Sequence, residues 1–161
     1  MRLAFFVPGS PITQGSGSAI VITDRQRSRR RCGCVGQYVP ENNNELRAWR
    51  KQVANGATWA VKDRGRPGPF KDTAYAIRAT FYLARGKTVK REMPFKKPDG
   101  DKLMRAIGDA LTGIVYEDDG QVTSGTFRKR YGRKTGVYIE ITLDAPDENE
   151  ETLFPAGEAA V

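Results

Sequence analysis

Residues 98–122 read PDGDKLMRAIGDALTGIVYEDDGQV, an apolar helical pattern with acidic residues at both ends. Apolar side chains recur at helical spacing from Leu103 to Leu111, which predicts a helix over about Lys102–Thr112. On a wheel that advances roughly 100° per residue, Asp101, Arg105 and Asp109 fall together on the opposite face. We therefore expect this helix to pack through one face and to present charged groups on the other.

The acidic residues gather at the two ends of this helix. Asp99 and Asp101 lie at its beginning, and the cluster 117–119 follows its end. Singly they have ordinary interpretations: a helix cap, an i,i+4 pair between Asp101 and Arg105, or a hairpin turn at Asp119. Together they would repel one another unless a cation neutralised them. All-oxygen ligands suit Mg²⁺ or Mn²⁺ rather than zinc, so the pattern predicts a divalent metal site.

The charge of the chain is unevenly distributed. The 161 residues, 39% of them hydrophobic, fit one domain with a sizeable core. The net charge is +8, but residues 144–161 hold six acidic and no basic residues, so residues 1–143 carry +14. A body this basic is expected to attract nucleic acid. No apolar run approaches the ~18 residues of a membrane span, and Pro8-Gly9 breaks the opening apolar stretch, so a cytoplasmic protein is expected.

Histidine is absent from the chain. This excludes Ser-His-Asp and Cys-His catalysis, nucleases with a histidine base and zinc sites that contain histidine. Catalysis would therefore depend on carboxylates, on lysine or arginine, and on a metal. Cys32 and Cys34 form a lone C-x-C pair, which supplies too few ligands for a structural zinc site. We interpret them as reduced cysteines in a loop.

The remaining pattern predicts an α+β domain over residues 1–144. Four segments read as strands: residues 3–7, 73–83, 121–131 and 137–143. A first helix follows Pro40, with Asn43 or Asn44 as its cap, and its expected core positions are Leu46, Trp49, Val53, Ala57 and Ala60. Trp49 and Trp59 are interpreted as packing residues. The order β-α-β-α-β-β indicates a mixed sheet of about four strands flanked by two main helices.

Two segments have extreme charge. The predicted loop 25–36 contains five arginines within seven positions, at Arg25, Arg27, Arg29, Arg30 and Arg31. It is either a solvated charged loop or an arm that grips phosphates, and the net charge favours the arm. Residues 145–161 are expected to form an acidic, flexible tail that serves solubility or competes with DNA for the basic surface.

The helix and its flanks resemble the RusA family of crossover-junction endodeoxyribonucleases, the Holliday-junction resolvases. The family pattern is approximately D-x-D-N-x-x-K-x-x-x-D-A-L, a short spacer, and then D-D-x-Q-V. This chain has DGDKLMR at 99–105, DAL at 109–111 and DDGQV at 118–122, with the spacing through the helix kept. The segment FFVPGSPITQG at 5–15 is similar to the first strand and loop of the family.

The resemblance implies a set of site residues: Asp99, Asp101 and Asp119 as Mg²⁺ ligands, with Asp118 nearby and Mn²⁺ as a substitute. Two positions depart from the family pattern. Arg105 stands where the family has a catalytic lysine; it keeps the positive charge but is a poor proton donor. It can still stabilise charge on the scissile phosphate. Lys102 replaces an asparagine and either weakens metal binding or takes over the role of the missing lysine.

The resemblance also implies the partners. They are four-way junction DNA and a second copy of the chain in a homodimer, with no small-molecule cofactor and no membrane, in a bacterial or phage-infected cell. The 25–31 arginines, with Lys129 and Arg130, are the expected contacts to the DNA backbone. Two alternatives stay open. One is a non-catalytic junction-binding protein of the same fold, inactivated by Lys102 and Arg105, and the other is a metal nuclease that acts on flaps or RNA.

Overall fold

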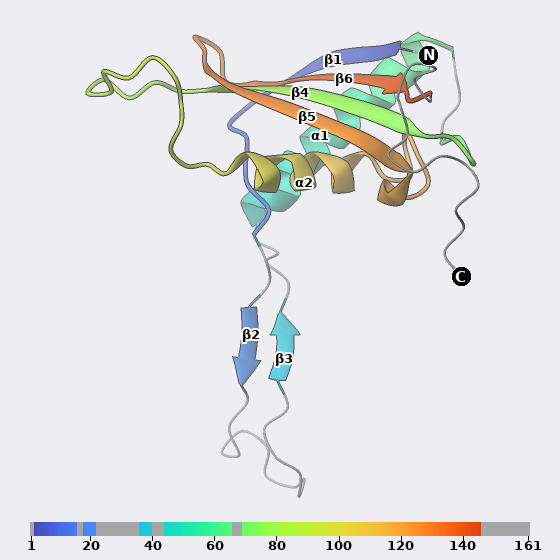
Figure 1. The fold of residues 1–161 in the computed structure, drawn as a ribbon, viewed down its shortest axis with the longest axis horizontal. Helices are drawn as coiled ribbons and strands as arrows, with labels where there is room; N and C mark the ends of the chain where they lie inside the picture. The colour runs from blue at the N-terminus through green and yellow to red at the C-terminus, as the bar shows by residue number, and fades with distance from the viewer. Residues whose placement is uncertain (1, 16–17, 22–35, 40–43, 66–68, 146–161) are drawn as a thin grey trace, which may run out of the picture.

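The computed structural model describes residues 2–15, 18–21, 36–39, 44–65 and 69–145 (Figure 1). The elements follow in the order β1 (Arg2–Pro8), β2 (Ser18–Val21), β3 (Gly36–Val39), α1 (Asn44–Asp63), β4 (Tyr75–Leu83), α2 (Gly100–Leu111), the 3₁₀ turn η2 (Asp119–Gln121), β5 (Val122–Tyr131) and β6 (Gly136–Leu143). The predicted α+β class and the order of the main elements are confirmed.

The four long strands form one mixed sheet in the order β1-β6-β4-β5. β6 runs antiparallel to both β1 and β4, whereas β5 runs parallel to β4 at the edge of the sheet. Parallel neighbours need a crossover connection, and α2 is the helix of that crossover. The helix must therefore run back against the direction of the strands, which places its two ends at opposite ends of the sheet.

One face of the sheet packs against α1 and α2 to form the core. Every second side chain of β4 is buried, from Tyr75 to Leu83, and Leu3 and Val7 of β1 lie on the same side. The expected apolar face of α2 is confirmed, as are the positions Leu46, Trp49, Val53 and Ala57 of α1, while Ala60 is partly buried.

One residue that was expected to pack lies at the surface instead, and so does the last residue of β6. The interpretation of Trp59 as a packing residue is wrong, because its side chain is 77% exposed. It lies on α1 outside the stripe that begins at Leu46 and ends at Ala57. Leu143 of β6 is 44% exposed, since it ends the sheet rather than lying within it.

A short hairpin arm stands apart from the body of the molecule in Figure 1. It consists of β2 and β3, which pair antiparallel with Ser18 opposite Val39 and Val21 opposite Gly36. Apart from a few apolar residues, nothing in the sequence pattern predicts strands here. The 25–31 arginines, Cys32, Cys34 and the tail from residue 146 lie outside the described residues, so the expectations for them stay predictions.

Candidate active site

Asp99 lies at the N-cap position of α2 without capping the helix through its side chain. Its backbone is extended (φ −72°, ψ 133°), and its carbonyl accepts the amide of Leu103 at 3.1 Å. The carboxylate instead lies 3.3 Å from Nζ of Lys102, one turn along, and remains 44% exposed. The capping alternative therefore does not hold for Asp99, and its carboxylate is open to solvent beside a lysine.

The charged face of α2 is arranged as its sequence predicted. Asp101, Arg105 and Asp109 are all exposed, on the side opposite the buried residues. Among the described residues, neither Asp101 nor Arg105 has an ion pair or a side-chain hydrogen bond, so the i,i+4 pair does not form. At the start of α2, a carboxylate and a guanidinium one turn apart are thus free to bind something other than each other.

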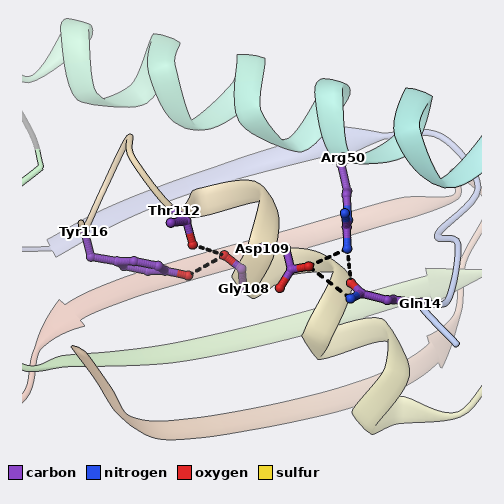
Figure 2. Close-up of polar contacts among 6 residues, drawn as sticks. All are labelled: Gln14, Arg50, Gly108, Asp109, Thr112 and Tyr116. Atoms are coloured by element: carbon purple, nitrogen blue, oxygen red, sulfur yellow. Dashed lines mark hydrogen bonds and ion pairs between the residues drawn. The ribbon is translucent and has the colours of Figure 1, made fainter. Parts of the chain in front are cut away.

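Asp109 has a different role, because two other segments hold it (Figure 2). Arg50 of α1 forms an ion pair with Oδ2 of Asp109, and Nε2 of Gln14 donates to the same oxygen at 3.0 Å. Arg50 also donates to Oε1 of Gln14, and the backbone amide of Gln14 donates to the carbonyl of Lys102 at 3.1 Å. This cluster ties the segment after β1, helix α1 and helix α2 together. Nothing in the sequence pattern indicated it.

The Asp109→Ala variant is expected to be less stable by about 1–3 kcal/mol, because the half-buried Arg50 would lose its charged partner. The free energy of unfolding from urea titration measures the change. Asp101→Ala is the matched control: it removes from the same helix a carboxylate that contacts no described side chain, and its stability is expected to stay within about 0.5 kcal/mol of that of the unsubstituted protein. Equal losses in both variants would contradict a structural role for the Asp109 cluster.

The second acidic cluster forms a 3₁₀ turn, not a hairpin turn. Asp118 caps η2: its Oδ1 accepts the amide of Gly120 at 2.8 Å. In return, Oε1 of Gln121 accepts the amides of Asp118 at 3.3 Å and Glu117 at 2.8 Å. The amide group of Gln121 donates to two backbone carbonyls before β4, which fixes the turn to the sheet. Asp119 is exposed, and its side chain has no partner among the described residues.

Tyr116 connects this turn to the C-terminal end of α2. Its hydroxyl donates to the carbonyl of Gly108 at 2.8 Å (Figure 2). Burial raises the pKa of Tyr116, and the negative charges of Asp119 and Asp109 raise it further. The phenol therefore stays protonated, as this hydrogen bond requires. The same contacts place Asp119 near the end of the helix that is remote from Asp99.

One chain does not bring the three predicted metal ligands together. Asp99 and Asp101 lie at the start of α2, whose 12 residues span about 18 Å, and Asp119 lies beyond its other end. Nζ of Lys129 reaches the carbonyl of Pro98 at 2.9 Å, at the end of β5 away from η2. Within the described part of the chain, no group of three or more acidic, cysteine or histidine side chains could hold a metal ion. The physical reason is the crossover topology, which separates residues that precede α2 from residues that follow it.

The two predicted DNA contacts on β5 point to opposite faces of the sheet. Nζ of Lys129 donates to the carbonyls of Lys96 (3.0 Å) and Pro98 (2.9 Å) and so supports the segment that leads to Asp99. Arg130 is exposed, and its Nη1 lies 2.9 Å from the sulfur of Met93. Arg130 thus remains available to an anionic ligand, whereas Lys129 serves the site by holding its backbone.

Comparison with known proteins gives one result of high coverage. A family model described as "Endodeoxyribonuclease RusA" matches residues 19–142, more than three quarters of the chain. No curated protein matches the sequence. Among the described residues, no helix is both long enough and apolar enough to cross a membrane.

Proposed function

The chain belongs to the RusA family of endodeoxyribonucleases, and we propose that it resolves four-way DNA junctions by paired, Mg²⁺-dependent nicks during recombination and repair. The observation that carries the proposal is the start of α2. There Asp99 and Asp101 present solvent-exposed carboxylates, and Arg105 follows one turn later with no partner in the part of the chain that the structure describes. Local acid on a chain of net charge +8 suits a metal site that receives a polyanion. The expected location is the cytoplasm of a bacterial or phage-infected cell.

Each residue at the start of α2 would have its own role in the reaction. The carboxylates of Asp99 and Asp101 are hard oxygen ligands of the type that Mg²⁺ or Mn²⁺ prefers. The bound ion would polarise the scissile phosphodiester and favour attack by water. Arg105 would neutralise charge that develops on the phosphate. Lys102, whose Nζ contacts Asp99, would move toward the phosphate once the ion replaces it as the partner of that carboxylate.

The distance between Asp119 and the start of α2 favours a composite site. A two-fold axis near the middle of α2 would place the C-terminal end of one helix beside the N-terminal end of the other. Asp119 of the partner subunit, with Asp118 nearby, would then complete the ligand set of Asp99 and Asp101. Each homodimer would hold two equivalent sites, which suits a junction of near two-fold symmetry that is cut twice.

The DNA would be held by charge and selected by shape. The 25–31 arginines lie in the segment that joins β2 to β3, and we assign them to the phosphate backbone together with Arg130, while Lys129 would hold the backbone that leads to Asp99. Phosphate contacts position a protein on DNA without reading its sequence directly. Selectivity would therefore come from the geometry of the branch point.

A substrate panel tests the proposed reaction. The protein is incubated with a synthetic four-way junction, a flap, linear duplex DNA and an RNA duplex, each end-labelled, in Mg²⁺ or in excess EDTA. Paired symmetric cuts are expected in the junction with Mg²⁺ and none with EDTA, because the reaction needs the bound cation. Junction binding without cuts would favour the non-catalytic alternative. Cuts confined to flaps or RNA would favour a metal nuclease that acts on those substrates. Either result would contradict junction resolution.

A further inference from the structure

In the part of the chain that the structure describes, α1 and α2 both pack on the same face of the four-stranded sheet. The side chains that point away from α1 and α2 form what we call the outer face. Strand alternation and register place Phe6, Tyr138, Thr80 and Arg128 in one cross-strand row of this face. The aromatic residues of this face are not used by the site on α2, which lies on the opposite side of the sheet.

Aromatic side chains form a continuous strip across one end of the outer face. Phe6 is 41% exposed, lies opposite Tyr138, and meets the ring of Tyr82 edge-on with centroids 6.3 Å apart. Gly136 permits this contact, because a Cβ there would lie 2.6 Å from Cζ of Phe6. Phe6 lines one hollow together with Tyr82 and Tyr138, and a second hollow between β1 and α1 that extends to Trp59. Phe6 therefore links two open hollows lined by aromatic rings.

Cationic side chains border the same strip. Arg128 and Arg130 follow on β5 in the outer-face rows of Phe6 and Tyr82, and the turn residues Arg133 and Lys134 line the hollow beside Phe6. All four cationic side chains are exposed, and Arg130 also contacts the sulfur of Met93. The acidic residue of the next row, Glu140, is already paired with Arg2 at 2.5 Å. The end of the face that carries the rings is thus strongly basic.

We propose that this aromatic and basic strip binds single-stranded nucleic acid. Exposed rings stack on unpaired bases while arginines hold the phosphates, and this combination is typical of single-strand binding surfaces. Duplex DNA does not suit the rings, because its bases are already stacked on one another. A second copy of the chain does not suit the charges: two-fold pairing of the strip would place Arg128 and Arg130 against their own counterparts.

Tryptophan fluorescence offers a direct test. Trp49 is buried at 3% exposure, whereas Trp59 is exposed and lines a hollow that Phe6 also lines, so quenching by a base bound beside Phe6 reports on Trp59. Binding of a fluorescein-labelled oligothymidylate is followed by anisotropy in EDTA, so that no nuclease chemistry is needed. In parallel, an unlabelled oligomer is added to the protein and the quenching of tryptophan fluorescence is recorded. Quenching is expected in the unsubstituted protein. Trp59→Phe is expected to bind with the anisotropy change retained and most of the quenching lost.

The charge contribution is tested with a matched pair of double variants. Arg128→Ala with Arg130→Ala is expected to weaken oligothymidylate binding at least tenfold, with a salt dependence of log K shallower by about 0.7 per lost phosphate contact. Arg64→Ala with Lys71→Ala removes the same charge at the other end of the molecule and is expected to leave binding unchanged. Phe6→Ala is expected to bind oligothymidylate roughly tenfold more weakly, because a bound base loses the ring on which it stacks.

Three outcomes would overturn the proposal: no binding of oligothymidylate, binding that the β5 variant leaves unchanged, or a change of oligomeric state in that variant, which would make the face an interface between copies. Asp101→Asn is expected to bind the oligomer like the unsubstituted protein. Absence of junction cleavage by the unsubstituted protein, with quenching intact, would contradict the nuclease proposal alone.

Discussion

Replacing Asp101 by asparagine is expected to reduce nicking of a four-way junction by about a thousandfold or more. The substitution keeps the shape of the side chain but removes the charge that would hold the cation, whose electrostatic stabilisation is worth several kcal/mol. Asp101 is exposed and has no side-chain partner among the described residues, so the described fold does not depend on it. Single-turnover nicking of a labelled junction in Mg²⁺ measures the effect.

Two measurements distinguish loss of the reaction from loss of the folded protein. The urea midpoint and the affinity for a junction in EDTA are both expected to be unchanged in Asp101→Asn, because neither depends on the bound cation. Asp63→Asn is the matched control: it neutralises an exposed carboxylate at the end of α1, remote from α2, and should nick at the normal rate. Normal nicking by Asp101→Asn would contradict the assignment of the start of α2 as the metal site.

The periodic parts of the fold could be predicted because burial imposes a strict pattern on them. β4 alternates buried and less buried side chains over its full length, and α2 separates its apolar and charged faces. Segments of this length show a hydrophobic period that identifies them as a strand or a helix. The strands β2 and β3, with four residues each, are too short to show a period, and the sequence predicts no strand at either position.

The tertiary contacts of the site could not be predicted in the same way. Asp109 shares a helix face with Asp101 and Arg105, yet its partners Gln14 and Arg50 are distant in the sequence. The exposure of Trp59 depends on how α1 is rotated against β1. Closeness of acidic residues along the chain also suggested closeness in space, whereas the crossover between β4 and β5 moves η2 to the far end of α2.

This separation leads to a second expected result. A mixture of Asp101→Asn and Asp119→Asn subunits should nick junctions, although each variant alone should not. If a site combines the start of α2 from one subunit with Asp119 from the other, a heterodimer places both substitutions in one site and leaves its second site intact. Equal amounts, unfolded and refolded together, should recover about a quarter of the normal sites, since half of the dimers are mixed.

The products and a matched mixture make this result specific. A heterodimer with one intact site should give single nicks in place of paired symmetric cuts, which denaturing and native gels of the same junction distinguish. Asp99→Asn mixed with Asp101→Asn should show no recovery, because both residues come from the same subunit of each site and every site then carries one substitution. Recovery in both mixtures, or in neither while the unsubstituted protein is dimeric and active, would contradict a site shared between subunits. Recovery only in the first would show that the ends of two α2 helices meet, because no arrangement within one chain can restore an intact ligand set from two defective subunits.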